Sequence, residues 1–194
     1  LSIVGISQKA IKQMETAALP RCFFDFRDML NGYANNGYPY TPSVGLLNGL
    51  KLATDMLLDE GLDAVFERHA RIASGVRAAG GGWGLHLCAQ RPEWQSDTVS
   101  TILVPDGFDA SEIVSRAATV YGTAFGTGLG EVAGRVFRIG HLGMLTEGMA
   151  LQGIATAEMV MADLGLPITL GSGVAAAQEV YRGSVTDALQ IAAE

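Results

Sequence analysis

The sequence of 194 residues has little cysteine, little basic charge and no long apolar run. Its two cysteines, Cys22 and Cys88, are too few for a disulfide framework, which favours a reducing compartment and predicts a cytoplasmic protein. The 13 basic residues against 20 acidic ones give a formal net charge of −7, which argues against a nucleic-acid partner. No apolar stretch is long enough to span a bilayer, so we expect no membrane partner either.

Several motifs of common enzyme classes are also missing. The three histidines, His69, His86 and His141, show no metal-ligand spacing among themselves or with the cysteines, so no metal site is expected. The segment 126–130 (GTGLG) lacks the last glycine of the dinucleotide-binding pattern, because Glu131 occupies that position, and no P-loop Lys-Ser/Thr follows. We interpret it as a plain loop. Without a G-x-S-x-G nucleophile elbow, a hydrolase is only a weak alternative.

Hydrophobic residues make up 48% of the chain, enough for a substantial core, and their periodicity divides the sequence into two parts. The first part predicts a strand over 1–6, a helix over 9–18 capped by Ser7, a long loop over 31–42 and helices over 43–58 and 62–79. The second part predicts short strands separated by helices, with a boundary near 80–83. The expected strands are 83–88, 99–104, 124–125 and 136–140, and the expected helices are 109–121, 146–164 and 173–181. Helices followed by a small sheet indicate an α+β arrangement.

Two segments carry candidate binding groups. In a strand over 136–140 (VFRIG), Phe137 and Ile139 share one face, so Arg138 points the opposite way. A guanidinium is a natural bidentate partner for a carboxylate, although a single arginine on a strand is more often a surface charge. In the segment 37–42 (GYPYTP), two prolines restrict the backbone beside hydroxyl side chains that could receive a phosphate. An ordinary proline-stiffened loop is the alternative.

These segments, in this order, resemble the serine–glyoxylate and alanine–glyoxylate branch of the class V, fold-type I aminotransferases, which use pyridoxal 5'-phosphate. Within that branch the chain is most similar to the aspartate–glyoxylate aminotransferases of the β-hydroxyaspartate cycle. The similar stretches are LPRCFFDFRDM at 19–29, NGYPYTPSVGLLNGL at 36–50, EGLDAVFERHARIASGVRAA at 60–79, FGTGLGEVAGRVFRIGHLG at 125–143, GIATAEMVMADLGLPI at 153–168 and GSGVAAAQEVYR at 171–182.

The resemblance implies an α/β fold of the fold-type I transferases. Residues 1–42 would form the end of the large cofactor-binding domain with a phosphate-contacting loop, 43–82 connecting helices, and 83–194 a small α+β C-terminal domain. It further implies that Arg138 binds the substrate α-carboxylate and that Tyr38 and Thr41 contact the cofactor phosphate of the neighbouring subunit in a homodimer or larger homo-oligomer. The implied activity is transfer of an amino group from an L-amino acid, preferably aspartate, to glyoxylate, which yields glycine and, from aspartate, oxaloacetate.

The lysine that holds the cofactor as a Schiff base is expected upstream of Leu1. Ser7-Gln8-Lys9 imitates the family's Ser-Gln-Lys motif, but it lies only a short helix before Leu19-Pro20-Arg21, where the family has a second, non-catalytic position. Lys9 would also lie in the first turn of a helix, whose dipole disfavours a cation, with polar neighbours that give no sign of burial. We therefore expect Lys9 to be a solvated surface lysine and no catalytic residue to lie within this chain.

Alternatives stay open at the level of sequence. A serine–glyoxylate or alanine–glyoxylate activity fits the same motifs, and a second cation for an aspartate side chain has three candidates, Arg21, Arg27 and Arg135. If the protein begins at Leu1, a non-catalytic dimerisation domain is the rival interpretation. A cysteine desulfurase is less favoured, because neither cysteine lies in a Gly/Ser-rich loop that could carry a persulfide.

Overall fold

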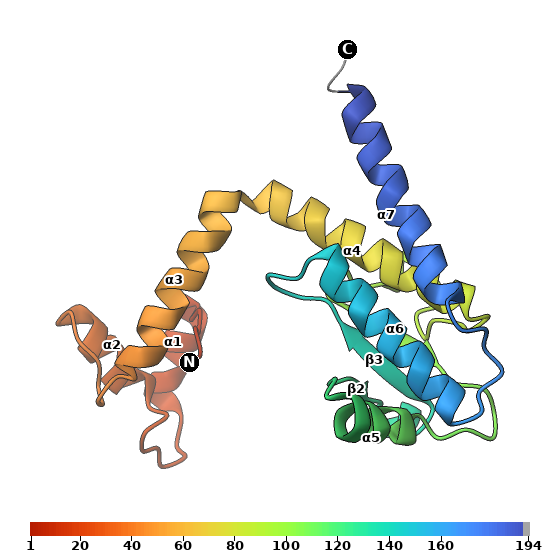
Figure 1. The fold of residues 1–194 in the computed structure, drawn as a ribbon. Helices are drawn as coiled ribbons and strands as arrows, with labels where there is room; N and C mark the ends of the chain where they lie inside the picture. The colour runs from red at the N-terminus through yellow and green to blue at the C-terminus, as the bar shows by residue number, and fades with distance from the viewer. Residues whose placement is uncertain (192–194) are drawn as a thin grey trace. The chain divides into compact units, whose positions relative to one another are not determined.

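The computed structural model describes the backbone of residues 1–191 and the side chains of residues 1–183, which form two compact units divided at Gly61. The first unit contains α1 (Gln8–Thr16), α2 (Phe26–Ala34) and α3 (Val44–Glu60) (Figure 1). The second contains α4 (Leu62–Gly82), β1 (Val99–Leu103), α5 (Ala110–Tyr121), β2 (Gly126–Thr127), β3 (Val136–Gly140), α6 (Glu147–Asp163) and α7 (Ser172–Ile191). None of the described helices combines the length and apolar character needed to cross a membrane.

Side-chain caps set the start of four of the described helices, including α1, for which the sequence predicted a cap at Ser7. Ser7 accepts a hydrogen bond from the N–H of Ala10, Asp109 from Ser111, and Thr146 from Met149. Each of these oxygens satisfies a backbone donor that has no partner inside the helix. Asp25 caps α2 in the same way, although the sequence pattern did not predict that helix.

Three short strands form an antiparallel sheet in the order β1-β3-β2 in the second unit. The predicted strands over 99–104 and 136–140 are confirmed, with Thr101 opposite Arg138 and Ile102 opposite Phe137. One sheet face turns Ile102, Phe137 and Ile139 into a core shared with α4, α5, α6 and α7. The strand expected over 124–125 instead begins at Gly126, and the strand expected over 83–88 is reduced to a single bridge between Leu87 and Ile102.

A glycine allows the close contact between α4 and α7. The ring of Tyr181 on α7 occupies the place where a Cβ on Gly75 of α4 would lie, 2.2 Å from that position. The Tyr181 hydroxyl donates to the carbonyl of Ile72 over 3.0 Å, and burial raises the pKa of this phenol to about 12. These contacts fix α7 against α4, the pair of helices that Figure 1 shows crossing closely in the second unit.

Two expectations for the first unit were wrong. Residues 1–6 form no strand, because a strand needs a neighbour for its backbone groups and none of the described residues pairs with them. The stretch 26–34, assigned in part to a loop because of Asn31 and Gly32, is the helix α2. Packing of the following loop on Gly32 overrides the low helix propensity of these two residues.

Candidate substrate- and cofactor-binding residues

Arg138 lies on β3 and points away from the core, as its alternation with Phe137 and Ile139 predicts. Phe137 and Ile139 are buried at 0% and 5% exposure, whereas Arg138 is half-buried on the opposite face of the sheet. Val136 shares the face of Arg138 but is nearly fully buried, because the turn after β2 covers it: a Cβ on Gly128 would lie 2.8 Å from Val136 Cγ2. The covering turn leaves Arg138 as the charged group on this face of β3.

The neighbouring strand holds the Arg138 side chain in place. Its Nε donates to the carbonyl oxygen of Thr127 over 2.9 Å. The guanidinium lies across Gly126, where a Cβ would lie 3.0 Å from Nε and 3.3 Å from Nη2. No carboxylate among the described side chains lies within ion-pair distance of Arg138. With Nε engaged, the two Nη groups form the edge that can bind a carboxylate in a bidentate manner.

Tyr38 and Thr41 belong to the first unit, in the loop between α2 and α3. Both are exposed, Tyr38 at 61%, and neither hydroxyl has a hydrogen-bond partner among the described residues. Two uncommitted hydroxyls on a loop that contains Pro39 and Pro42 suit a phosphate, which offers several acceptor oxygens. Arg138 belongs to the other unit.

A hollow of about 440 Å³ lies between this loop and α2, lined by Tyr38, Tyr40 and Asp28 among others. Its lining contains no arginine or lysine, and the Asp28 carboxylate would repel an anion. A phosphate would therefore meet Tyr38 and Thr41 from outside the hollow.

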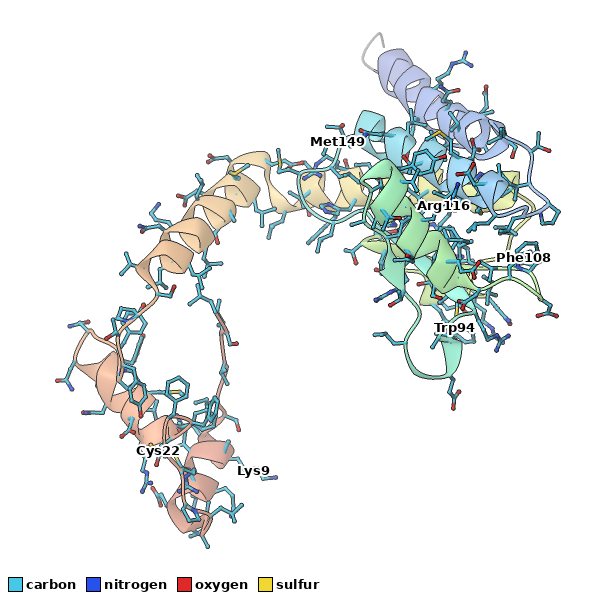
Figure 2. The ribbon with its side chains drawn as sticks, turned by 60° about the horizontal axis from the view of Figure 1, so that its bottom comes forward. Lys9, Cys22, Trp94, Phe108, Arg116 and Met149 are labelled. Atoms are coloured by element: carbon cyan, nitrogen blue, oxygen red, sulfur yellow. The ribbon has the colours of Figure 1, made fainter. Side chains whose placement is uncertain are left out.

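Lys9 lies in the first turn of α1 and is exposed, with its side chain extending away from the helix in Figure 2. A lysine that forms a Schiff base needs a desolvated site that favours its neutral form. The surroundings of Lys9 in this unit do not supply one, which supports the expectation of a surface lysine.

Asp25 organises the segment that precedes the loop of Tyr38 and Thr41. It is 5% exposed and forms ion pairs with Arg27 and Arg21, and it accepts the N–H of Arg27 at the start of α2. Hydrogen bonds from Arg27 lower the pKa of this carboxyl to about 2. Both arginines are therefore committed to Asp25, which makes them poor candidates for binding a second substrate carboxylate.

The turn after β3 is held by two buried histidines. His141 contacts the hydroxyl of Ser100 through Nε2 and donates from Nδ1 to the carbonyl of Asp97, both over 3.0 Å. His69 accepts the N–H of Gly143 at Nε2, so its Nδ1 donates to the carbonyl of Val65 over 2.7 Å. These are structural roles, and the described residues contain no group of His, Cys, Asp and Glu that could hold a metal ion.

Known proteins that resemble this chain include several named aminotransferases. The chain is 68% identical over 193 of its 194 residues to the L-aspartate–glyoxylate aminotransferase of Paracoccus denitrificans, and covers 49% of that protein. It is 50% identical over 188 residues to the serine–glyoxylate aminotransferase of Hyphomicrobium methylovorum, covering 96% of this chain and 46% of that protein. No protein-family model matches the chain.

The chain is a homologue of the glyoxylate aminotransferases. It spans about half the length of the curated relatives it matches. Among solved structures, pyridoxamine–pyruvate aminotransferase from Mesorhizobium loti superposes with a TM-score of 0.83 at 33% identity, over 93% of this chain and 47% of that one. Alanine–glyoxylate aminotransferase from Nostoc sp. superposes with a TM-score of 0.71 at 26% identity, over 80% of this chain and 42% of that one. The fold is accordingly that of the fold-type I aminotransferases, in mixed helix and sheet.

The sequence predicted Arg138, Tyr38 and Thr41 as candidate binding residues, but it did not predict the groups that contact Arg138. The Thr127 carbonyl is a backbone group, and any residue at that position would supply it. Gly126 contacts Arg138 because the two residues are paired across β2 and β3. This register could not be predicted from the sequence, because β2 is too short to show a pattern.

Proposed function

We propose that this chain is part of a pyridoxal-phosphate-dependent aminotransferase that transfers the amino group of L-aspartate to glyoxylate, giving oxaloacetate and glycine. The observation that carries the proposal is the 68% identity, along the full chain, to a protein with this named activity. Arg138 supports it, because its two Nη groups are available for the α-carboxylate that the amino donor and glyoxylate have in common.

The residues of the chain fit the cofactor that the family implies. Tyr38 and Thr41 would donate hydrogen bonds to the cofactor phosphate of the neighbouring subunit, which would make the enzyme a homodimer or a larger homo-oligomer with composite active sites. Bound there, the cofactor supplies an electron sink for amino transfer. Arg138 holds the substrate by its carboxylate so that the reacting carbon is oriented, and the lysine that accepts the proton lies upstream of Leu1. We place the protein in the cytoplasm.

Serine is the second candidate donor. It is favoured by the 50% identity to a serine–glyoxylate aminotransferase. An aspartate donor also calls for a second cation, and Asp25 engages two of the three candidates. The third, Arg135, is exposed and has no carboxylate partner among the described side chains.

The donor is tested with the complete enzyme by measuring kcat/KM for L-aspartate, L-serine and L-alanine at a fixed, saturating glyoxylate concentration. The proposal requires the highest value with aspartate. A higher value with serine would replace it by the serine–glyoxylate activity. No glycine with any of the three donors would reject a glyoxylate aminotransferase.

A further inference from the structure

Phe23 has a backbone conformation that an aromatic residue rarely adopts. Its φ of +69° lies in the left-handed region, where the Cβ of a bulky residue is crowded by its own backbone. Such a residue persists only where its surroundings hold it, and such outliers gather at functional sites. The ring of Phe23 stacks on Tyr40, with ring centroids 4.9 Å apart and planes inclined by 28°, and meets the edge of Phe24 at 5.1 Å.

The loop that contains Tyr40 is held on its other side by α2. The N–H of Gly37 donates to the carbonyl of Gly32 over 2.8 Å. A Cβ on Gly32 would lie 2.9 Å from the nitrogen of Pro39 and 3.0 Å from the carbonyl carbon of Tyr38. Both of these atoms belong to the backbone, so any side chain at position 32 would have to displace the loop itself.

The contacts of Gly32 and of Phe23 involve residues adjacent in the chain to Tyr38 and Thr41, which the proposed function assigns to the phosphate. Tyr38 lies between Gly37 and Pro39, which contact Gly32, and Thr41 follows Tyr40, which stacks on Phe23. We infer that Phe23 and Gly32 are positioning residues that hold the Tyr38 and Thr41 hydroxyls in the arrangement that binds the cofactor phosphate. This inference rests on the proposed function, and it adds two residues to the phosphate site of the neighbouring subunit's cofactor.

A positioning role makes a specific prediction about affinity. Disorder in the loop should weaken binding of the phosphate group and leave binding of the rest of the cofactor unchanged. The reason is that Phe23 and Gly32 act only through Tyr38 and Thr41. Pyridoxal, which lacks the phosphate, provides the comparison. A general loss of stability would weaken the binding of pyridoxal 5'-phosphate and of pyridoxal alike.

The test uses the complete apoenzyme and measures dissociation constants for pyridoxal 5'-phosphate and for pyridoxal by absorbance titration. Phe23→Leu and Gly32→Ala should each weaken binding of pyridoxal 5'-phosphate by about 5- to 10-fold, the scale of one lost aromatic pair. Each should change pyridoxal binding by less than about twofold. Phe23→Tyr, which keeps the ring, should bind as the wild type does, and so should Gly153→Ala, a helical glycine with open space around it.

Two further variants keep the test decisive. Tyr40→Leu removes the same stack from the other ring and replaces Phe23→Leu if that protein does not fold. The double variant Tyr38→Phe/Thr41→Val should lose more phosphate affinity than either positioning variant. Adding Phe23→Leu to it should cause no further loss, because a positioning residue has no effect once the groups it positions are gone.

Equal weakening toward both ligands, or wild-type affinity in Phe23→Leu and Gly32→Ala, would overturn the inference. If the double variant loses phosphate affinity while the positioning variants do not, the proposed phosphate site stands and only the role of Phe23 and Gly32 is rejected. If the double variant also retains full phosphate affinity, the phosphate role of the loop is rejected together with this inference.

Discussion

At the scale of single residues, Arg138 has a geometry that the strand pattern alone does not supply. Its Nε is bound by the Thr127 carbonyl, so a carboxylate has to approach the two Nη groups. Lysine at this position would present a single ammonium that cannot form the same pair of parallel hydrogen bonds.

The substitution Arg138→Ala should lower kcat/KM, because removing one charge-assisted bidentate pair should cost the transition state about 2–4 kcal/mol of stabilisation. Arg138→Lys should lose a large part of the same energy. The measurement is steady-state kinetics of the complete enzyme with the amino donor and with glyoxylate as varied substrates. Near-normal efficiency of Arg138→Ala with both substrates would place the carboxylate site elsewhere.

A second residue-scale prediction concerns Lys9. Because it is exposed in the first turn of α1, Lys9→Ala should leave the absorbance of the bound cofactor unchanged. Borohydride reduction of the complete enzyme followed by peptide mapping should place the pyridoxyl group upstream of Leu1. A pyridoxyl group on Lys9 would refute this assignment.

His141 should make the stability of the protein sensitive to acid. Burial lowers the pKa of this imidazole, and nearby Arg77 lowers it further, whereas the hydrogen bond to the Asp97 carbonyl acts in the opposite direction. Because the folded pKa is below the unfolded value, the folded state binds fewer protons. The contribution of His141 to stability is complete above the pKa of about 6.5 that the imidazole has in the unfolded chain. This contribution is lost as the pH falls through the lower pKa that the imidazole has in the folded protein.

The free energy of unfolding, measured by denaturant titration between pH 8 and pH 5, should therefore fall as the pH falls. His141→Gln should have a lower stability at pH 8 and a shallower dependence on pH. The exposed His86 supplies the control, since His86→Gln should keep the wild-type dependence. An unchanged slope in His141→Gln would show that other groups cause the acid sensitivity.

At the scale of the element, α7 begins on a buried carboxylate. Glu158 of α6 is 3% exposed and accepts hydrogen bonds from Trp83 Nε1 and from the backbone N–H groups of Gly171, Gly173 and Val174. These donors include free N–H groups at the start of the helix, where the helix dipole also favours a negative charge. One side chain on α6 thus contacts both Trp83, directly after α4, and the start of α7.

Replacing this carboxylate by an amide should destabilise the protein. In Glu158→Gln the amide NH₂ would face a backbone N–H, so one buried donor would lose its acceptor, at a cost of about 1–3 kcal/mol. Chemical denaturation measures the change, and the exposed Glu112→Gln on α5 is the matched control. A loss no greater than that of the control would show that α7 does not depend on this cap.

Local signals in the sequence predicted most elements and failed where long-range contacts decide. The cap at Ser7 located α1, apolar periodicity located the helices over 109–121 and 146–164, and alternation located β3 together with the outward direction of Arg138. The helix α2 was missed because Asn31 and Gly32 are typical of turns, whereas the structure uses the glycine for a backbone contact with Pro39. The left-handed conformation of Phe23 could not be predicted, because no local preference favours it.

At the scale of the whole molecule, the proposed role of Tyr38 and Thr41 makes each active site composite. Subunits with Tyr38→Phe/Thr41→Val and subunits that lack only the upstream lysine should each be inactive. After subunit exchange, one site of a mixed dimer would combine an intact lysine with an intact loop, so activity should return. Mixed dimers detected by mass spectrometry that remain inactive would reject the contribution of the loop across subunits.

Amino transfer itself is tested most directly by following the nitrogen atom. The complete enzyme is incubated with L-[¹⁵N]aspartate and unlabelled glyoxylate, and the products are quantified by mass spectrometry. The proposed function predicts [¹⁵N]glycine and oxaloacetate in equal amounts, with formation of both strongly reduced in Arg138→Ala. Glycine without the label, or no glycine while the label stays in aspartate, would contradict an aspartate–glyoxylate aminotransferase.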